Sequence, residues 1–232
     1  MSALLSSGTH TTANGAGFLG GGQLGYNWQI SGARFGVNDF VAGLETDFQG
    51  INGSNGSPAS YGVLQNPVSE GESMFSTTNV SKRVSYLGTV RGRLGYLALP
   101  ELLIYGTAGM AYGPAQSSFS TYQGDYGYWG TLTTGVTGSG SYSSTLVGWT
   151  GGGGVEWMFL KNWSAKVEYL YYDLGNVSYS TSPLLTLGDP SDVNGTGSPY
   201  WSSAATASTR FNGSIVRAGV NYHFDIGSPA IH

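Results

Sequence analysis

The sequence predicts an all-β protein: an antiparallel, up-and-down transmembrane β-barrel of the eight-stranded type, of which seven strands are recognised. Three observations predict this fold class. Apolar residues make up 40% of the 232 residues and charged residues only 9%, against roughly a quarter in soluble domains. Glycine contributes 39 residues and aromatic residues 13%. Seven segments alternate between apolar and polar positions with the period of two that β-strands have.

The composition excludes several other classes of protein. A soluble domain this poor in charge would lack a solubilising surface, and a disordered chain would have fewer aromatic residues. The longest apolar stretch, near residues 94–104, is interrupted by Pro100 and Glu101, so no segment reaches the ~18 apolar residues of a membrane helix. A formal net charge of −4 argues against binding to nucleic acid. A chain without cysteine has neither disulfides nor thiolate metal sites.

Each predicted strand places apolar side chains on one face and small or polar side chains on the other. In 162–172, Trp163 and Val167 share one face, and Lys166 and Glu168 share the opposite one. The strands are expected, in chain order, at residues 18–29, 40–49, 85–97, 102–112, 147–159, 162–172 and 216–224. In the same order, their apolar faces include Leu24, Tyr26 and Trp28; Phe40, Leu44 and Phe48; Tyr86, Val90 and Leu94; Leu102, Ile104 and Met110; Trp149, Val155 and Trp157; Trp163, Val167 and Tyr171; and Val216, Val220 and Tyr222.

Aromatic residues mark both ends of these apolar faces. From Tyr86 to Tyr96 is ten residues, which at ~3.3 Å per residue and a tilt of ~40° spans roughly 20–25 Å. The apolar band of a membrane barrel is about 25 Å tall and is bordered by aromatic girdles. The strands of a soluble β-sandwich also alternate in hydropathy, but a sandwich gives no reason for aromatic residues to gather at both ends of the apolar face. One girdle is expected from Tyr26, Trp28, Phe40, Tyr96, Trp157, Trp163, Tyr222 and Phe224, and the other from Phe48, Tyr86, Tyr112, Trp149 and Tyr171.

Eight charged residues fall on the faces that point into the predicted barrel. An ~8-stranded barrel has an interior only wide enough for side chains, so we expect these residues to form a buried network of paired charges. A narrow polar path for small ions is the alternative. A catalytic pair of carboxylates is disfavoured because each acid has a base nearby. The eight residues are Glu45, Asp47, Arg91, Arg93, Glu156, Lys166, Glu168 and Arg217.

The connections between the strands alternate in length. Outer-membrane barrels have short periplasmic turns and long extracellular loops. The short joins lie near 30–39, 98–101 and 160–161, and the long ones at about 50–84, 113–146 and 173–213. We therefore expect a single barrel domain over 1–232, with the long loops outside the cell. Residues 1–15 would be the remnant of another extracellular loop, and residues 225–232 a periplasmic extension.

A count of seven strands does not fit a closed barrel of this kind. Bacterial single-chain barrels have an even number, and an unpaired strand edge in lipid leaves its N–H and C=O groups without partners. Residues 1–16 contain no basic segment followed by an apolar one, so no signal peptide is recognised. We expect one further strand and an export signal upstream of residue 1. A strand supplied by another chain is the alternative.

Seven segments together resemble a known family. They are GFLGGGQLGYNWQ at 17–29, VAGLETDFQG at 41–50, GTVRGRLGY at 88–96, LIYGTAGMAYG at 103–113, GWTGGGGVEW at 148–157, NWSAKVEYLYYDLG at 162–175 and VRAGVNYHF at 216–224. In this order they are similar to the small porin-like outer-membrane β-barrels of alphaproteobacteria, often called outer-membrane immunogenic proteins. The resemblance covers nearly all of the seven strands and not the loops. It implies an eight-stranded barrel in the bacterial outer membrane, abundant, structural and antigenic, without enzymatic activity.

Two further motifs carry no expected chemistry. Gly20-x-Gly22-x-x-Gly25 matches a dinucleotide-binding fingerprint, but that fingerprint needs a strand before it and a helix after it. Here it lies inside a predicted strand. His10, His223 and His232 are scattered along the chain, which predicts neither a Ser-His-acid triad nor a metal cluster. No enzyme activity, cofactor or metal is expected.

The Ser/Gly/Thr-rich connections carry a second set of candidate residues. Aromatic side chains on such a background are typical of adaptable binding surfaces. The sequence therefore predicts a structural outer-membrane protein with at most narrow porin-like permeability, surrounded by lipid and lipopolysaccharide. The alternative is a surface adhesin whose loops bind a partner. The loop candidates are Tyr122, Tyr126, Tyr128, Trp129, Tyr200 and Trp201.

Overall fold

All of the described secondary-structure elements are β-strands. The computed structural model describes residues 17–30, 40–53, 59–65, 73–126, 132–182, 184–186, 200–202 and 206–224. These residues include no helix of the length and hydrophobicity needed to span a membrane. The strands are β1 (Gly17–Ile30), β2 (Phe40–Gly53), β3 (Ala59–Gln65), β4 (Ser73–Val84), β5 (Tyr86–Leu99), β6 (Leu102–Tyr126), β7 (Leu132–Leu160), β8 (Trp163–Ser180), β9 (Leu184–Thr186), β10 (Tyr200–Ser202) and β11 (Thr206–Tyr222).

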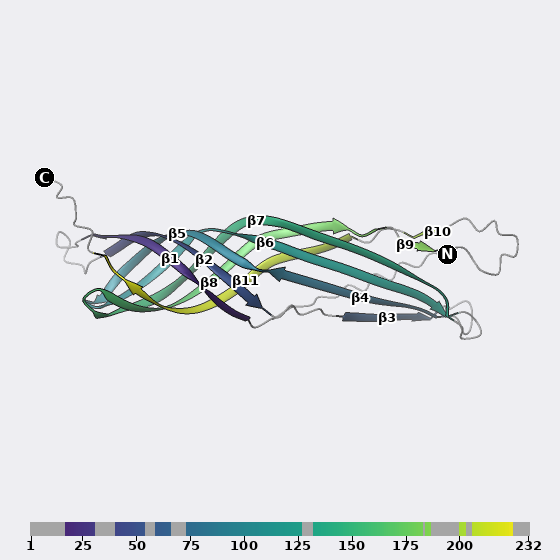
Figure 1. The fold of residues 1–232 in the computed structure, drawn as a ribbon, viewed down its shortest axis with the longest axis horizontal. Coiled ribbons are helices and arrows are strands. Elements are labelled where there is room, and N and C mark those ends of the chain that lie inside the picture. Colours follow the sequence, from purple (N-terminus) through teal and green to yellow (C-terminus); the bar gives the residue numbers. More distant parts are fainter. Residues whose placement is uncertain are drawn as a thin grey trace, which may run out of the picture.

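Most of these strands belong to one antiparallel sheet (Figure 1). Its order is β1-β2-β5-β6-β7-β8-β11, and β4 joins it at one end by pairing with both β3 and β6. β9 and β10 form a separate two-stranded ladder. The seven strands of the main path are the seven that the alternation of apolar residues predicts. The predicted all-β, antiparallel, up-and-down fold class is therefore confirmed.

The sheet curls round on itself without closing. Among the described residues, no ladder joins β1 to β11. Side chains from strands far apart in the sheet nevertheless meet across the interior. Arg217 of β11 lies 2.9 Å from Asp47 of β2, and Lys166 of β8 hydrogen-bonds to Gln23 of β1. The outer edges of β1 and β11 therefore flank a gap in a barrel-like sheet.

Four strands run further than the sequence predicts (Figure 1). β6 continues to Tyr126, β7 begins at Leu132, β8 continues to Ser180 and β11 begins at Thr206. Much of 113–146 and both ends of 173–213, expected as loops, are therefore strands. The hairpin of β3 and β4 lies within the first long expected loop, 50–84. The terminal segments 1–15 and 225–232 lie outside the described residues.

The reason for this difference is the composition of the added strands. They carry Ser, Thr and Gly on both faces, so the alternation in hydropathy that marks the other strands is absent. Hydroxyl pairs across the ladder hold them together instead. The Oγ1 atoms of Thr78 and Thr121 lie 3.4 Å apart, and Ser81 hydrogen-bonds to Ser118.

Two irregularities at one level divide the sheet. Ser85 separates β4 from β5, and its carbonyl accepts a hydrogen bond from the Ile51 amide at 2.9 Å. On β8, Gly175 has a φ of +90°, a backbone conformation that strongly favours glycine, opposite a register shift between Arg210 and Asn212. We call the part on one side the barrel half; it comprises β1, β2, β5, 102–112, 147–160, 163–172 and 213–222. The part on the other side is the extension; it comprises β3, β4, 113–126, 132–146, 173–180 and 206–212.

Candidate functional site

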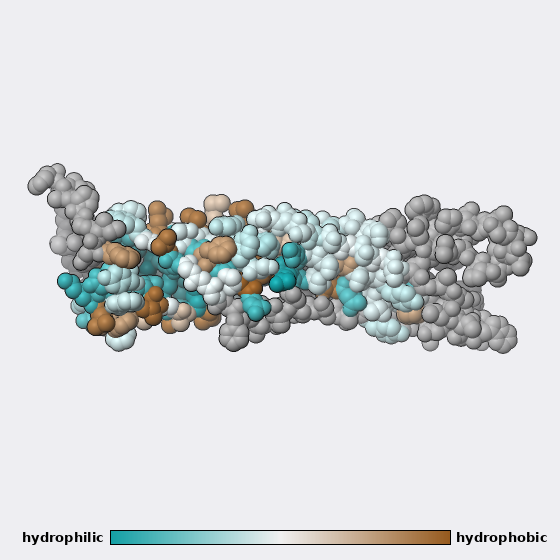
Figure 2. Space-filling view, in the orientation of Figure 1, coloured by the Kyte–Doolittle hydropathy of each residue, from teal (hydrophilic) through white to brown (hydrophobic). Residues whose placement is uncertain are grey.

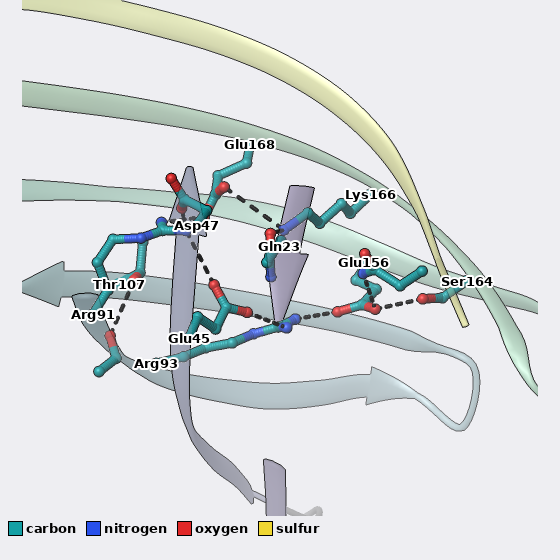
Figure 3. A network of polar contacts seen from close by, with 12 residues as sticks. Gln23, Glu45, Asp47, Arg91, Arg93, Thr107, Glu156, Ser164, Lys166 and Glu168 are labelled. Carbon is teal, nitrogen blue, oxygen red and sulfur yellow. Dashed lines mark hydrogen bonds and ion pairs between the residues drawn. The ribbon is translucent and has the colours of Figure 1, made fainter. Parts of the chain in front are cut away.

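The eight charged residues predicted to point inward lie together inside the barrel half, and all of them except Arg217 are labelled in Figure 3. Seven of them are buried, and Arg217 is partly exposed. The register of the ladders sets opposite charges beside one another, because Glu45 is paired with Arg91, Glu156 with Lys166 and Glu168 with Arg217. Strand alternation thus points each charge inward, and strand register places six of the eight directly opposite a charge of the other sign.

Arg91 is the centre of this network. One of its terminal nitrogens lies 2.7 Å from Glu168 Oε1. The other lies 2.7 Å from Asp47 Oδ2 and 3.2 Å from Glu45 Oε2. The Nε–H of Arg91 donates to Thr89 Oγ1 at 3.0 Å, and that hydroxyl in turn donates to Asp47 at 2.8 Å. Each of the three guanidinium nitrogens therefore donates to at least one acceptor inside the barrel.

Arg93 extends the network toward the short-turn end. It lies 2.9 Å from Glu45 Oε1 and forms a second ion pair with Glu156. The guanidinium carbon also lies 3.7 Å from the centre of the Tyr105 ring, a cation–π arrangement. Glu45 is thus shared between Arg91 and Arg93, which links the middle of the interior to one end.

Arg217 and Lys166 connect the network across the interior. Arg217 lies 2.9 Å from Asp47 and 2.6 Å from Glu168. The Lys166 ammonium lies 3.9 Å from Glu168 and donates to Gln23. Because these contacts join strands from both edges of the sheet, the network itself holds the curled sheet together.

Glu156, Ser164 and His223 meet at the short-turn end, a cluster that the sequence pattern did not predict. His223 Nε2 lies 2.8 Å from Ser164 Oγ and 3.5 Å from Glu156 Oε1. In a Ser-His-acid triad the acid holds Nδ1 and leaves Nε2 for the serine. Here serine and acid both contact Nε2, so the geometry is not that of a triad. The inward parity of the three residues beside one short turn was the available signal.

A second group that the sequence pattern did not predict is an apolar cluster at the border of the barrel half and the extension, with members in both. Its members are buried on the inward faces of several strands. Phe211 and Ala115 are 0% exposed, and Leu87 and Leu170 are 1% exposed. The cluster consists of Leu87, Ala111, Ala115, Leu170, Leu174, Val177, Phe211 and Ile215. The interior therefore changes along its length from paired charges to closely packed hydrocarbon.

The outward face of the barrel half is apolar (Figure 2). Leu24, Leu94 and Val216 are each more than 70% exposed. Aromatic side chains pair at both borders of this face, with ring centres 5.8 Å apart for Phe40 and Tyr96 at one border. At the other border, the rings of Trp149 and Tyr171 lie 5.4 Å apart. Soluble monomeric proteins rarely expose so many large apolar side chains on one face.

The predicted girdle residues occupy these borders. Next to the short turns, Tyr26 contacts Trp28, Trp157 contacts Phe159, and Trp163 contacts Tyr222, which also contacts Phe224. At the opposite border, Phe48 contacts Tyr86. The Tyr112 ring lies over Gly88, where even a Cβ atom would come within 2.3 Å of it. Glycine at position 88 therefore allows the ring to lie flat on the strand.

The family assignment follows from the match of the chain to a family model. The model of the outer membrane protein beta-barrel domain matches residues 3–224. The chain belongs to this family. The resemblance inferred from the strand segments and the location in the bacterial outer membrane are both confirmed, so the solvent of the apolar face is lipid.

Known outer-membrane proteins are similar to this barrel over about two thirds of its length. The 31 kDa outer-membrane immunogenic proteins of Brucella melitensis and Brucella suis are each 40% identical to it over 160 residues, 68% of this chain and 55% of theirs. The 22 kDa outer membrane protein of Rhizobium leguminosarum bv. viciae is 31% identical over 161 residues, 68% of this chain and 54% of its own. The barrel chain spans about half the length of these relatives. Their names describe outer-membrane proteins and no enzyme. No solved structure matches the chain.

The loop candidates are only partly described. Tyr122 lies on β6, where its ring centre is 5.6 Å from that of Phe75. Phe75 in turn lies 6.5 Å from Tyr61, which is 69% exposed. Tyr128 and Trp129 lie outside the described residues, and so do the side chains of Tyr126, Tyr200 and Trp201.

Two ionisable groups of the extension, Asp173 and Lys82, have pKa values that their surroundings lower. Asp173 accepts a hydrogen bond from Arg210 Nε at 3.2 Å, and this guanidinium holds the pKa of the carboxyl below its ordinary value. Lys82 donates to the Arg210 carbonyl and lies 5.2 Å from the centre of the Phe211 ring. Burial lowers the pKa of this ammonium. Within the described part of the chain, no three His, Cys, Asp or Glu side chains are grouped as a metal site.

Proposed function

We propose that the chain serves as a structural protein of the outer membrane, with a filled interior that passes small ions at most. The observation that supports this is the succession of two plugs along the interior. Arg91 is 1% exposed within the charge network, and Phe211 is 0% exposed within the apolar cluster. A barrel of ~8 strands has room for side chains and little more. A hydrated solute would have to displace both plugs.

The two plugs oppose different solutes. The apolar cluster offers no hydrogen bonds to an ion that leaves its hydration shell, and an uncompensated charge there is strongly disfavoured. The charge network has a partner for each of its charges, so a passing ion would have to compete with salt bridges of 2.6–3.2 Å. For a small ion to pass, both the charge network and the apolar cluster would therefore have to move.

The orientation follows from the lengths of the connections. Outer-membrane barrels have short turns on the periplasmic side and long connections outside. The turns at Pro100–Glu101 and Lys161–Asn162 are short, and β6 and β7 extend furthest from the opposite end. We therefore orient the extension toward the outside of the cell.

A further strand is proposed to cover the edges of β1 and β11. Each unpaired backbone group in hydrocarbon is unfavourable by several kcal/mol, and two open edges in lipid would leave many such groups. One antiparallel strand with outward apolar and inward small residues would satisfy both edges. A segment of the same polypeptide and a segment of another chain are the two sources. Cross-linking of cysteines placed on the lipid-facing edges would distinguish them by the mass of the product.

The test of the structural role is a permeability measurement in liposomes. The reconstituted chain is expected to give no swelling with sugars and conductance far below that of a wide porin. Phe211→Ala, which shortens the apolar plug, should raise ion conductance if ions follow the interior. The matched lipid-facing change Val216→Ala should leave it unchanged. Rapid sugar uptake by the unmodified protein would contradict the proposal.

The aromatic cluster of the extension favours a second candidate function, adhesion to a surface partner. Tyr61, Phe75 and Tyr122 form a row of rings on the outermost part of β3, β4 and β6. Deleting residues 115–145 would remove ladder strands and unfold the sheet, so substitution is the better test. Tyr61→Ala with Tyr122→Ala should abolish cell or matrix binding by the intact protein if this cluster is adhesive. Unchanged binding would exclude it.

A further inference from the structure

We propose that the outward face of the extension, next to the outer aromatic girdle, binds the phosphorylated sugar headgroup of lipopolysaccharide. The site is a hollow of about 290 Å³ that crosses β4, β6 and β7. Its outward-facing lining has four hydroxyls, one amide and one guanidinium. These residues are Ser81, Arg83, Gln116, Ser118, Ser141 and Ser143.

Strand parity places six of the eight lining residues on the face of the sheet that is apolar in the barrel half, and the other two, Ser117 and Tyr142, on the inward face. On β6, Gln116 and Ser118 continue the exposed face of Met110 and Tyr112, while Ser117 between them is buried. From Tyr112 to Gln116 is four residues, which at ~3.3 Å per residue and a tilt of ~40° is a height of about 10 Å. The hollow therefore begins where the hydrocarbon ends, at the level of lipid headgroups.

The register arranges the polar groups as a lattice. Arg83, Gln116 and Ser143 form one row across the three strands. Ser81, Ser118 and Ser141 form the next row. Neighbouring groups are about 4.8 Å apart across the strands and about 6.6 Å apart along them. A flat array of donors and acceptors at this spacing is suited to the ring hydroxyls of a sugar.

Arg83 supplies the complementary charge for a phosphate. Its side chain is exposed, and the described ion pairs do not include it, whereas the other exposed cation of the described extension, Arg210, is paired with Asp173. None of the residues that line the hollow is acidic. A guanidinium can donate two parallel hydrogen bonds to one phosphate group. The site thus has one element for a phosphate and several for the sugar to which the phosphate is attached.

Lipopolysaccharide fits these features better than the other anions of the envelope. A phospholipid headgroup would use Arg83 and leave Gln116, Ser141 and Ser143 without a ligand group, whereas Ser81 and Ser118 already hydrogen-bond to each other. A free phosphate would find a single cation. The phosphorylated sugars of lipopolysaccharide meet both requirements, and they lie in the outer leaflet, which is the level of the hollow in the orientation proposed above.

Binding is measured with the full chain in a mild detergent, by counting bound lipids with native mass spectrometry. The probes are lipopolysaccharide, the same lipid with its phosphates removed, phosphatidylglycerol and inorganic phosphate. Arg83→Glu should lower lipopolysaccharide affinity by about tenfold or more, since a charge-assisted hydrogen bond contributes about 1.5–3 kcal/mol. Lys161→Glu, at an exposed cation of the opposite end, is the control and should leave affinity unchanged. Heat-modifiable migration on gels verifies that each variant is folded.

The loss of affinity caused by Arg83→Glu and the loss caused by removing the phosphates of the lipid should not add. Removing the phosphates from the lipid should weaken binding to the unmodified chain and have little further effect on Arg83→Glu. Three results would overturn the proposal: equal affinity of Arg83→Glu and the unmodified chain, equal retention of phosphatidylglycerol, or displacement of the lipid by an equal concentration of inorganic phosphate. Since all measurements are made in detergent, their failure leaves the structural role and the membrane orientation unaffected.

Discussion

The barrel half and the extension share four strands but differ in where their charged, hydroxyl and apolar side chains lie. On β8, Val167 and Tyr169 point outward from the barrel half, and Ser178 and Ser180 are among the exposed residues of the extension. The interior of the barrel half is held by ion pairs. Toward the extension the interior becomes apolar, with Phe211 at the border.

The difference shows that the surrounding solvent determines which face carries the polar groups. Lipid cannot solvate charge, so the charges of the barrel half lie inside, where they can pair only with one another. Water can solvate the outer face of the extension, which leaves its inner face available for hydrocarbon and hydroxyl contacts. A strand that crosses from lipid to water therefore changes the residues on both faces.

The largest effect is expected from Arg91→Ala, which leaves three buried carboxylates with one partner fewer. Breaking a buried ion pair by removing one partner costs about 3–5 kcal/mol. Urea unfolding of the reconstituted protein, followed by tryptophan fluorescence, measures this cost. Lys82→Ala in the extension should cost less, about 1.5–3 kcal/mol, the value of a hydrogen bond made by a charged group.

A double variant tests whether the loss comes from the unpaired acids. Removing Glu45 together with Arg91 leaves Arg93 paired with Glu156, and leaves Asp47 paired with Arg217. The double variant should therefore regain a large part of the lost stability. Strictly additive losses would show that Arg91 and Glu45 do not interact.

A charge on the outer face should distinguish the two halves next. Val167→Arg places a cation near the middle of the bilayer and should cost about 2–4 kcal/mol. Ser178→Arg on the same strand faces water and should change stability by no more than about 0.5 kcal/mol. Both are measured by unfolding in vesicles. Equal costs at the two positions would disprove the assignment of the outer faces to different solvents.

Gly175→Ala tests the border between the halves. The positive φ of this residue should make alanine unfavourable by about 1–2 kcal/mol. Gly22→Ala is the matched control, because a Cβ atom has nothing within 4 Å at either position, but only Gly175 has a positive φ. If thermal unfolding gives the same midpoint for both variants, the backbone at Gly175 is not constrained.

The smallest effect concerns Asp173 in the extension. Its folded pKa is depressed by Arg210, so its stabilising contribution is fully present above the unfolded value of about 3.9 and is lost as the pH falls through the folded value. Arg210→Gln should raise the carboxyl pKa toward the ordinary value in an NMR titration. An unchanged pKa would mean that this guanidinium does not interact with the carboxyl in solution.

The sequence predicts the barrel half well because lipid imposes a strict pattern there. The apolar face of each strand had to continue from one girdle to the other, so residues such as Val90 and Val167 fixed the phase of the inward charges. The pairing partners were less predictable. The contact between Arg217 and Asp47 depends on how far the sheet curls, which alternation within a strand does not determine.

The sequence does not predict the strands of the extension because water imposes no such hydropathy pattern on them. Ser, Thr and Gly on both faces are also the composition of irregular loops. The apolar cluster, in contrast, is indicated by the parity of two leucines. Leu87 and Leu170 stand on the inward faces of their strands by simple parity, where a uniformly polar interior would place neither.

The ion pair between Arg217 and Asp47 has a consequence for assembly. The two residues are 170 positions apart in sequence, and contacts of such separation form late because the intervening chain must first be ordered. If strands associate in chain order, Asp47 is therefore in the sheet before Arg217 reaches it. Arg91, on the strand next to it in the ladder, is available early and neutralises it. The ion pairs can therefore form strand by strand, so that no carboxylate is left unpaired in lipid. The last strand then adds Arg217 as a second partner to an Asp47 that Arg91 has already neutralised.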